Sequence, residues 1–123
     1  KFRGSTSWWI GPAGTITPMH HDTSNIVFTQ VVGRKRITLV SAMHTALLDH
    51  ARDGFYSDLR PELLEEAGIP HHVVELEPGE ALFIPVGWWH EVEALEPSVN
   101  LSFLNCTQPN HFKWYRPVRA RSR

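Results

Sequence analysis

The feature that most constrains the fold of this chain is a series of short β-like segments separated by proline and glycine turns. Eight such segments are predicted, over residues 8–10, 15–19, 25–32, 36–40, 73–76, 81–84, 90–95 and 99–106. Turn residues such as Gly11-Pro12, Pro78-Gly79 and Pro85-Val86-Gly87 end several of them. Eight short strands of this kind are typical of a closed barrel or jelly roll, and a small barrel can hold one ligand inside.

A helical insertion is predicted to divide the strands into two blocks of four. Residues 45–51 and 61–67 have helical patterns; Pro61 suits a first helical turn and Gly68 a C-terminal cap. Within the first block, residues 36–40 alternate polar and apolar side chains, as half-buried strands do. Because the tight turn Gly33-Arg34 joins this segment to residues 25–32, we expect the two segments to form a hairpin.

The size and composition of the chain predict one ordinary globular domain. The chain has 123 residues, of which 41% are hydrophobic, and no apolar run reaches the 18 residues that a membrane helix needs. The start, at Lys1-Phe2, shows neither a signal peptide nor an initiator methionine, so we expect flanking residues to be missing upstream. The single cysteine, Cys106, favours a reducing, cytoplasmic location and is expected to be a buried apolar residue.

The charge pattern does not favour a nucleic-acid-binding protein. The formal net charge is −1, and the only concentration of basic residues is at the end of the chain, where a solvated terminus is the simpler interpretation than a binding surface. These basic residues are Lys113, Arg116, Arg119, Arg121 and Arg123.

The run His20-His21-Asp22 is the first candidate metal-binding pattern. In an extended chain, residues two apart point to the same side, so His20 and Asp22 face one way and His21 the other. A histidine nitrogen and a carboxylate oxygen on one side can bind one face of a divalent cation. A His-x-Asp pattern alone is common, however, and carries little weight.

The second pattern is rarer. A strand in residues 79–84 is followed by the turn Pro85-Val86-Gly87, two tryptophans and His90. If the strands close into a barrel, His90 reaches the cavity that His20 and Asp22 line. Two histidines and one carboxylate form the facial triad of non-haem Fe(II) oxygenases, which leaves positions open for a cosubstrate and O₂. The alternative is that His20 and His90 are ordinary surface or hydrogen-bonded histidines.

The positions of the other histidines in the chain separate them from the metal site. The other histidines lie in the insertion, near turns or in the tail, and are predicted not to be ligands: His44, His50, His71, His72 and His111. At least one of Trp88 and Trp89 is expected to pack against the barrel and fix the direction of His90.

Polar residues on other strands are candidates for binding a cosubstrate. Lys35 has the parity of the apolar Ile37 and Leu39, and a lysine facing a core needs an anionic partner, although an ordinary lysine at a turn explains it equally well. Thr17 lies three residues before His20, and Ser102 shares one strand face with Asn100. For Thr17 an ordinary strand threonine is slightly favoured by the sequence alone, and alternating polar residues such as Asn100 and Ser102 are just as often solvent-facing. Arg34 and Arg36 have the opposite parity to Lys35 and should point outward.

With these residues in view, the chain resembles the JmjC-type, cupin-like protein hydroxylases. The resemblance runs from about residue 8 to residue 105. The matching stretches are 9–15, Thr17-Pro18-Met19-His20-His21-Asp22, Gln30-Val31-Val32-Gly33-Arg34-Lys35, Pro78-Gly79-Glu80, Ile84-Pro85 and Trp88-Trp89-His90.

The resemblance implies one catalytic core over residues 1–123, with an insertion at 45–68 and without its N-terminal flanking elements. The implied fold is a mostly β double-stranded β-helix. The implied chemistry is that of an Fe(II)- and 2-oxoglutarate-dependent dioxygenase that uses O₂ to hydroxylate a protein, peptide or amino-acid-like substrate. His20, Asp22 and His90 match the iron ligands, Lys35 the partner of the distal carboxylate of 2-oxoglutarate, and Thr17 the hydroxyl residue beside it.

The chain departs from the family pattern at one cosubstrate contact. Many relatives have an asparagine six residues after the first histidine, where this chain has Ile26 and the asparagine is Asn25. A shift of one residue normally turns a strand side chain to the other face, so Asn25 reaches the cosubstrate only if a bulge restores its direction.

Several alternatives stay open at this stage. The chain fits another metal-dependent cupin, such as an isomerase or a dioxygenase without a 2-oxo acid, or a non-catalytic barrel that only binds. Lysine demethylation is less expected than hydroxylation because the chain carries no additional chromatin-reading or zinc module. A homodimer formed through regions outside this chain is also left open.

Overall fold

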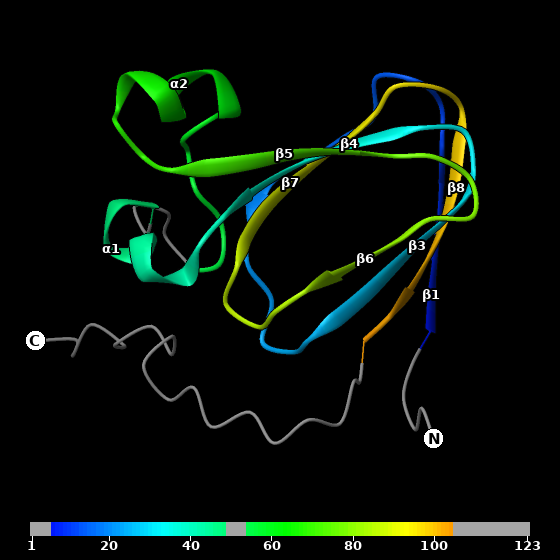
Figure 1. The fold of residues 1–123 in the computed structure, drawn as a ribbon, viewed down its shortest axis with the longest axis horizontal. Coiled ribbons are helices and arrows are strands. Elements are labelled where there is room, and N and C mark those ends of the chain that lie inside the picture. The colour runs from blue at the N-terminus through cyan, green and yellow to red at the C-terminus, as the bar shows by residue number, and fades with distance from the viewer. Residues whose placement is uncertain (1–5, 49–53, 105–123) are drawn as a thin grey trace, which may run out of the picture.

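The computed structural model describes residues 6–48 and 54–104, which form eight antiparallel strands in two sheets and a helical insertion (Figure 1). The first sheet has the order β1-β8-β3-β6 and the second the order β2-β7-β4-β5. The strands of the first sheet are β1 (Thr6–Gly11), β8 (Ser98–Phe103), β3 (Ile26–Val32) and β6 (Ala81–Ile84). Those of the second are β2 (Ile16–His20), β7 (Trp89–Ala94), β4 (Lys35–Val40) and β5 (His71–Leu76).

This arrangement confirms the mostly β barrel that the sequence predicts. The two sheets face each other across a core of alternating strand residues that includes Ile26, Phe28, Ile37, Leu39 and Val92. Strand pairs are set by register, for example Leu39 opposite His90 and His20 opposite His90. The register therefore fixes which side chains meet inside the barrel. No helix in the described part of the chain is long and apolar enough to cross a membrane.

The predicted hairpin between residues 25–32 and 36–40 is wrong. Strand β3 pairs with β6 and β8, whereas β4 pairs with β5 and β7 in the other sheet. The tight turn at Gly33 takes the chain from one sheet to the other. Gly33 has a φ of 68°, and a Cβ built there would lie 2.3 Å from the Pro97 carbonyl oxygen, so the turn requires glycine.

The insertion covers one end of the outer face of the second sheet (Figure 1). It contains a short 3-10 helix (Ala42–His44), α1 (Thr45–Leu48) and α2 (Pro61–Glu66). Pro61 opens α2, and Gly68 follows it with a φ of 67°, both as predicted. Leu48, Leu64 and Ile69 of the insertion pack with Val40 and Trp89 in a second buried cluster. The first helix is predicted to run from residue 45 to residue 51, and residues 49–51 of this prediction lie outside the described residues.

Candidate metal centre and adjoining pocket

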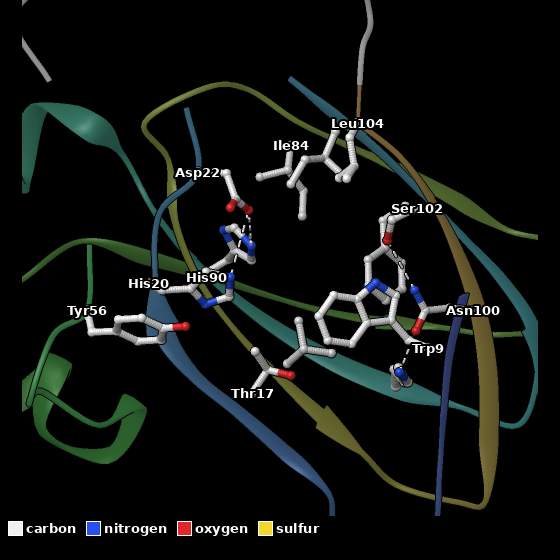
Figure 2. Close-up of a pocket in the computed structure, with 14 residues that line it drawn as sticks. Trp9, Thr17, His20, Asp22, Tyr56, Ile84, His90, Asn100, Ser102 and Leu104 are labelled. Carbon is white, nitrogen blue, oxygen red and sulfur yellow. Dashed lines mark hydrogen bonds and ion pairs between the residues drawn. The ribbon is translucent and has the colours of Figure 1, made fainter. Parts of the chain in front are cut away.

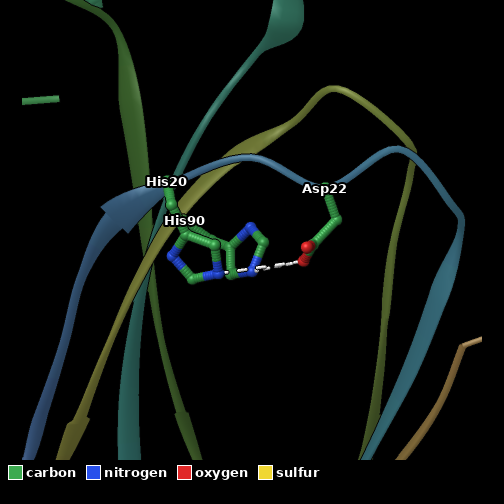
Figure 3. A group of neighbouring side chains, drawn as sticks. All are labelled: His20, Asp22 and His90. Carbon is green, nitrogen blue, oxygen red and sulfur yellow. Dashed lines mark ion pairs between the residues drawn. The ribbon is translucent and has the colours of Figure 1, made fainter. Parts of the chain in front are cut away.

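Three side chains, from β2, from the loop that follows it and from β7, converge at one end of the barrel (Figure 3). His20 ends β2, Asp22 follows it in the next loop, and His90 lies on β7 directly opposite His20. The Asp22 Oδ2 atom lies 3.8 Å from His20 Nε2 and 3.5 Å from His90 Nε2. One ligand atom from each residue lies within 4.8 Å of the other two, and no other group of three potential ligands occurs in the described ranges.

Backbone carbonyl groups orient both imidazoles toward this point. His20 Nδ1 lies 2.7 Å from the Pro18 carbonyl oxygen, and His90 Nδ1 lies 3.0 Å from that of Trp88. A carbonyl oxygen only accepts, so each Nδ1 carries the proton and donates it. The Nε2 lone pairs are thereby left to face Asp22, which is the tautomer that a metal-binding histidine needs.

The environment of His90 also favours the neutral ring. Burial lowers the pKa of His90 to about 4, and the neighbouring His20 acts in the same direction, while the Trp88 carbonyl and Asp22 oppose the shift. At neutral pH the ring is therefore uncharged and can donate its lone pair. Two imidazoles and one carboxyl group on the same side suit a divalent transition metal, so the donor set fits the iron that the sequence resemblance implies.

The neighbouring residues of each motif face away from this centre. His21 is buried behind it, with Nε2 2.8 Å from the Gly54 carbonyl oxygen and its ring 4.6 Å from that of Trp89. Trp89 is fully buried and donates from Nε1 to Thr45 Oγ1 at 3.0 Å, while Trp88 is half-buried. The packing role expected for one of these tryptophans is confirmed.

A cavity of about 230 Å³ adjoins the three converging side chains (Figure 2). Its walls come from both sheets and from the insertion. Apart from the three potential metal ligands, they are lined by Trp9, Thr17, Ile26, Phe28, Lys35, Tyr56, Ile84, Val92, Asn100, Ser102 and Leu104. The sequence-predicted residues Thr17, Lys35 and Ser102 therefore do meet in one pocket with His20, Asp22 and His90.

Lys35 provides the cation of this pocket. It is buried on the inner face of β4, donates from Nζ to Asn100 Oδ1, and lies 5.7 Å from the centre of the Phe28 ring. Burial lowers the pKa of Lys35. Among the described residues no carboxylate forms an ion pair with it, whereas Arg34 and Arg36 pair with glutamates on the outer surface. In the described part of the chain, Lys35 therefore has a neutral amide and an aromatic ring as partners but no carboxylate.

The structure does not bring Asn25 into this pocket. Its Oδ1 accepts a hydrogen bond from the Val86 backbone N–H at 3.0 Å, in the turn that precedes His90. Ile26, the next residue, lines the cavity instead. Asn25 lies just before β3, whose pairing with β6 begins at Ile26 opposite Ile84.

Two aromatic residues of the pocket were not identified from the sequence. Tyr56 comes from the insertion, where its ring stacks on His20 with centroids 5.6 Å apart, and Trp9 comes from the edge strand β1. Strand parity did not single out Trp9, because its neighbours Trp8 and Ile10 are also apolar. No local pattern marks Tyr56, which is held beside His20 by the hydrogen bonds His21 N to Phe55 O and Ser57 N to Met19 O.

Comparison with known proteins identifies the family. Residues 1–107 match the model of the cupin-like domain. The chain belongs to the cupin-like domain family. Its relatives include lysine-specific demethylase JMJ30 of Arabidopsis thaliana, which is 36% identical over 108 residues, and Jumonji C domain-containing protein 5 of Drosophila melanogaster, 36% identical over 104 residues. HSPB1-associated protein 1 of Homo sapiens is 36% identical over 102 residues.

These matches confirm the JmjC-type, cupin-like resemblance. They cover 80%, 77% and 72% of this chain, respectively. The same alignments cover only 25%, 26% and 21% of the relatives, so this cupin-like chain spans about a quarter of their length.

Proposed function

We propose that this chain is the catalytic core of an Fe(II)- and 2-oxoglutarate-dependent oxygenase that oxidises a side chain of a protein or peptide. The observation that carries the proposal is one pocket in which His20, Asp22 and His90 converge and the buried Lys35 lacks an anionic partner among the described residues. The three converging side chains suit the metal, and Lys35 suits the far end of a dicarboxylate that reaches from the metal into the barrel.

The residues of this chain have distinct roles in the proposal. His20, Asp22 and His90 hold Fe(II), which together with 2-oxoglutarate and O₂ supplies the oxidising chemistry when bound. Lys35 neutralises the distal carboxylate of 2-oxoglutarate, since an unpaired charge is strongly disfavoured in a poorly solvated pocket. Thr17 and Ser102 offer hydroxyl groups to the same anion.

The apolar walls of the pocket are assigned to excluding water. Ile26, Ile84 and Leu104 line the pocket together with Asp22. Ile84 and Leu104 are seen beside Asp22 in Figure 2. Water exclusion strengthens the charge interaction of Lys35 and limits side reactions at the metal. In this account Asn25 acts indirectly, by holding the turn before His90 through Val86.

The substrate class rests on family membership and on the openness of the metal site. Asp22 keeps 41% of its side chain exposed and Tyr56 is 46% exposed, so the metal side of the pocket is accessible from outside. Several relatives are named as lysine-specific demethylases, and this chain spans about a quarter of their length. We favour hydroxylation of a side chain, and oxidative demethylation is the alternative outcome of the same reaction type. We also propose that the protein works in a reducing compartment.

The proposal is tested by following the fate of 2-oxoglutarate under air. Protein loaded with Fe(II) should convert 2-oxoglutarate to succinate, and a peptide library should yield a product heavier by one oxygen atom. Asp22→Ala should lose both activities, while Glu75→Gln, on the outer surface, should keep them. If succinate is not formed by the wild-type protein under any of these conditions, the chain is instead another metal-dependent cupin or a binding module.

A further inference from the structure

A second groove, separate from the metal centre, lies on the outer face of the second sheet. It has a volume of about 230 Å³ and lies between strands β5, β4 and β7 and the start of α2. Its lining residues are Arg36, Thr38, Pro61, Glu62, His71, Val73, Glu91 and Glu93. None of these residues lines the metal-side pocket, because alternate residues of β4 and β7 point to opposite faces of the sheet.

In the first cross-strand row of this outer face, formed by Glu75, Arg36 and Glu93, every charged side chain has an ion-pair partner. Arg36 of β4 lies between Glu75 of β5 and Glu93 of β7 in the strand register. Its Nη2 lies 3.0 Å from Glu75 Oε1, and its Nη1 lies 3.1 Å from Glu93 Oε2. One guanidinium therefore bridges two carboxylates across three strands.

The next row has a carboxylate but no cation. Thr38 takes the central position, with Val73 on one side and Glu91 on the other. Glu91 and Glu62 both line the groove. Glu91 forms no ion pair with any described residue within 4.0 Å. The row thus has an anion without a contacting cation.

The floor of the groove offers an unused hydroxyl group. Thr38 is only 4% exposed and lines the groove, yet its side chain makes no hydrogen bond with any residue that the structure describes. A ligand that donates hydrogen bonds can use this hydroxyl group as an acceptor. The hydroxyl and the carboxylates of Glu91 and Glu62 therefore present acceptors to the same space.

The arrangement of the carboxylates in this groove favours an extended organic cation over a divalent metal ion. A divalent metal needs ligand atoms that converge, and within the described ranges only His20, Asp22 and His90 do so. Carboxylates spread around an elongated groove instead suit an extended cation with several N–H donors. We propose that this groove binds a lysine or arginine side chain of a polypeptide partner, which would occupy the place in the Thr38 row that Arg36 occupies in its own row.

The test uses single basic side chains as probes of the metal-free 123-residue protein. N-acetyl-arginine amide and N-acetyl-lysine amide are titrated while amide shifts are followed by NMR, with N-acetyl-citrulline amide as the neutral isostere of the first probe. The basic probes should shift the amides of Thr38, Val73 and Glu91, and the citrulline probe should not. Since exposed ion pairs are worth at most about 1 kcal/mol, Glu91→Gln should weaken binding by about threefold to fivefold.

Glu75→Gln is the matched control, because it removes the same charge from the same face but from the completed row. It should change probe affinity by less than about twofold. Thr38→Val, which keeps the shape and removes the hydroxyl group, should also weaken binding. Equal effects of Glu75→Gln and Glu91→Gln would show general surface attraction and overturn the proposal, as would shifts confined to the metal-side pocket or equal binding of the citrulline probe.

Discussion

The inner and outer faces of the second sheet contrast most clearly at three pairs of neighbouring residues. On the inner face, His20, Lys35 and His90 enter the pocket. Their neighbours His21, Arg36 and Trp89 point the other way, where they pack under the insertion or pair with glutamates. Adjacent residues thus point into the proposed ligand site on one face and into packing or ion pairs on the other. Variants of Lys35 should therefore change 2-oxoglutarate binding, whereas variants of Arg36 and Trp89 should change stability and leave that binding unchanged.

The largest effect is expected on the outer face, at Trp89. This indole is fully buried among Met19, Val40, Leu48 and the rest of the second cluster. Trp89→Ala should lower the free energy of unfolding by about 3–5 kcal/mol, because it leaves a large cavity and removes the hydrogen bond that Trp89 Nε1 donates to Thr45 Oγ1. Urea unfolding followed by circular dichroism measures this, with the half-buried Trp88→Ala as the milder comparison. Equal losses for the two variants would contradict the assigned packing role.

The corresponding inner-face variant is Lys35→Ala. Removing one partner of a buried charge pair costs about 2–5 kcal/mol, so 2-oxoglutarate binding to the Mn(II)-loaded protein should weaken by that amount. Metal affinity should change little, because Lys35 is not one of the converging ligands. Isothermal titration calorimetry measures both. Wild-type 2-oxoglutarate affinity in Lys35→Ala would remove the basis for a 2-oxo acid in this pocket.

Acid should destabilise the metal-free protein because the buried, neutral His90 on the inner face binds a proton less readily than it does in the unfolded chain. The pKa of His90 is about 4 in the folded protein and 6.5 in the unfolded chain, so between these values only the unfolded chain binds the proton. The stability due to neutral His90 is complete above pH 6.5 and is lost as the pH falls through this window, by about 3 kcal/mol at most. Urea midpoints measured from pH 8 to pH 4 should show the fall, and His90→Gln should flatten it. An unchanged profile in the variant would assign the acid sensitivity to other groups.

The smallest effect is expected for Arg36→Ala on the outer face. Its two ion pairs with Glu75 and Glu93 are partly exposed, and such pairs contribute about 0–1 kcal/mol each. The free energy of unfolding should fall by about 1 kcal/mol or less, with the loss reduced in high salt. Affinity for 2-oxoglutarate should stay at the wild-type value, which separates Arg36 from its neighbour Lys35.

Residue parity made much of this contrast predictable from the sequence. The period of two correctly placed Lys35 inside and Arg36 outside, and it separated His20 and Asp22 from His21. Parity works at these positions because each strand has one face on the core. The side chains of the three potential metal ligands are therefore placed by local rules together with the closure of the barrel.

Sheet pairing and long-range contacts were not predictable in the same way. The turn at Gly33 has the local signature of a hairpin, but the chain there passes from one sheet to the other, and the glycine is required by its close approach to Pro97, a distant residue in the sequence. Asn25 Oδ1 accepts a hydrogen bond from the Val86 backbone N–H, and Val86 lies 61 residues further along the chain. Tyr56 reaches His20 through backbone pairing of the insertion, which no local pattern encodes. Cys106, His50, His111 and the basic tail lie outside the described residues, so those predictions stay as they were.

The central claim, that one pocket binds Fe(II) and 2-oxoglutarate together, is tested most directly by an anaerobic titration. Fe(II) is added to the protein first and 2-oxoglutarate second, while the visible absorption spectrum is recorded. Simultaneous coordination predicts a metal-to-ligand charge-transfer band that appears only when both are present, that is lost in Asp22→Ala, and that needs much more 2-oxoglutarate in Lys35→Ala than in Arg36→Ala. A wild-type protein that binds Fe(II) but develops no such band at saturating 2-oxoglutarate would contradict the claim.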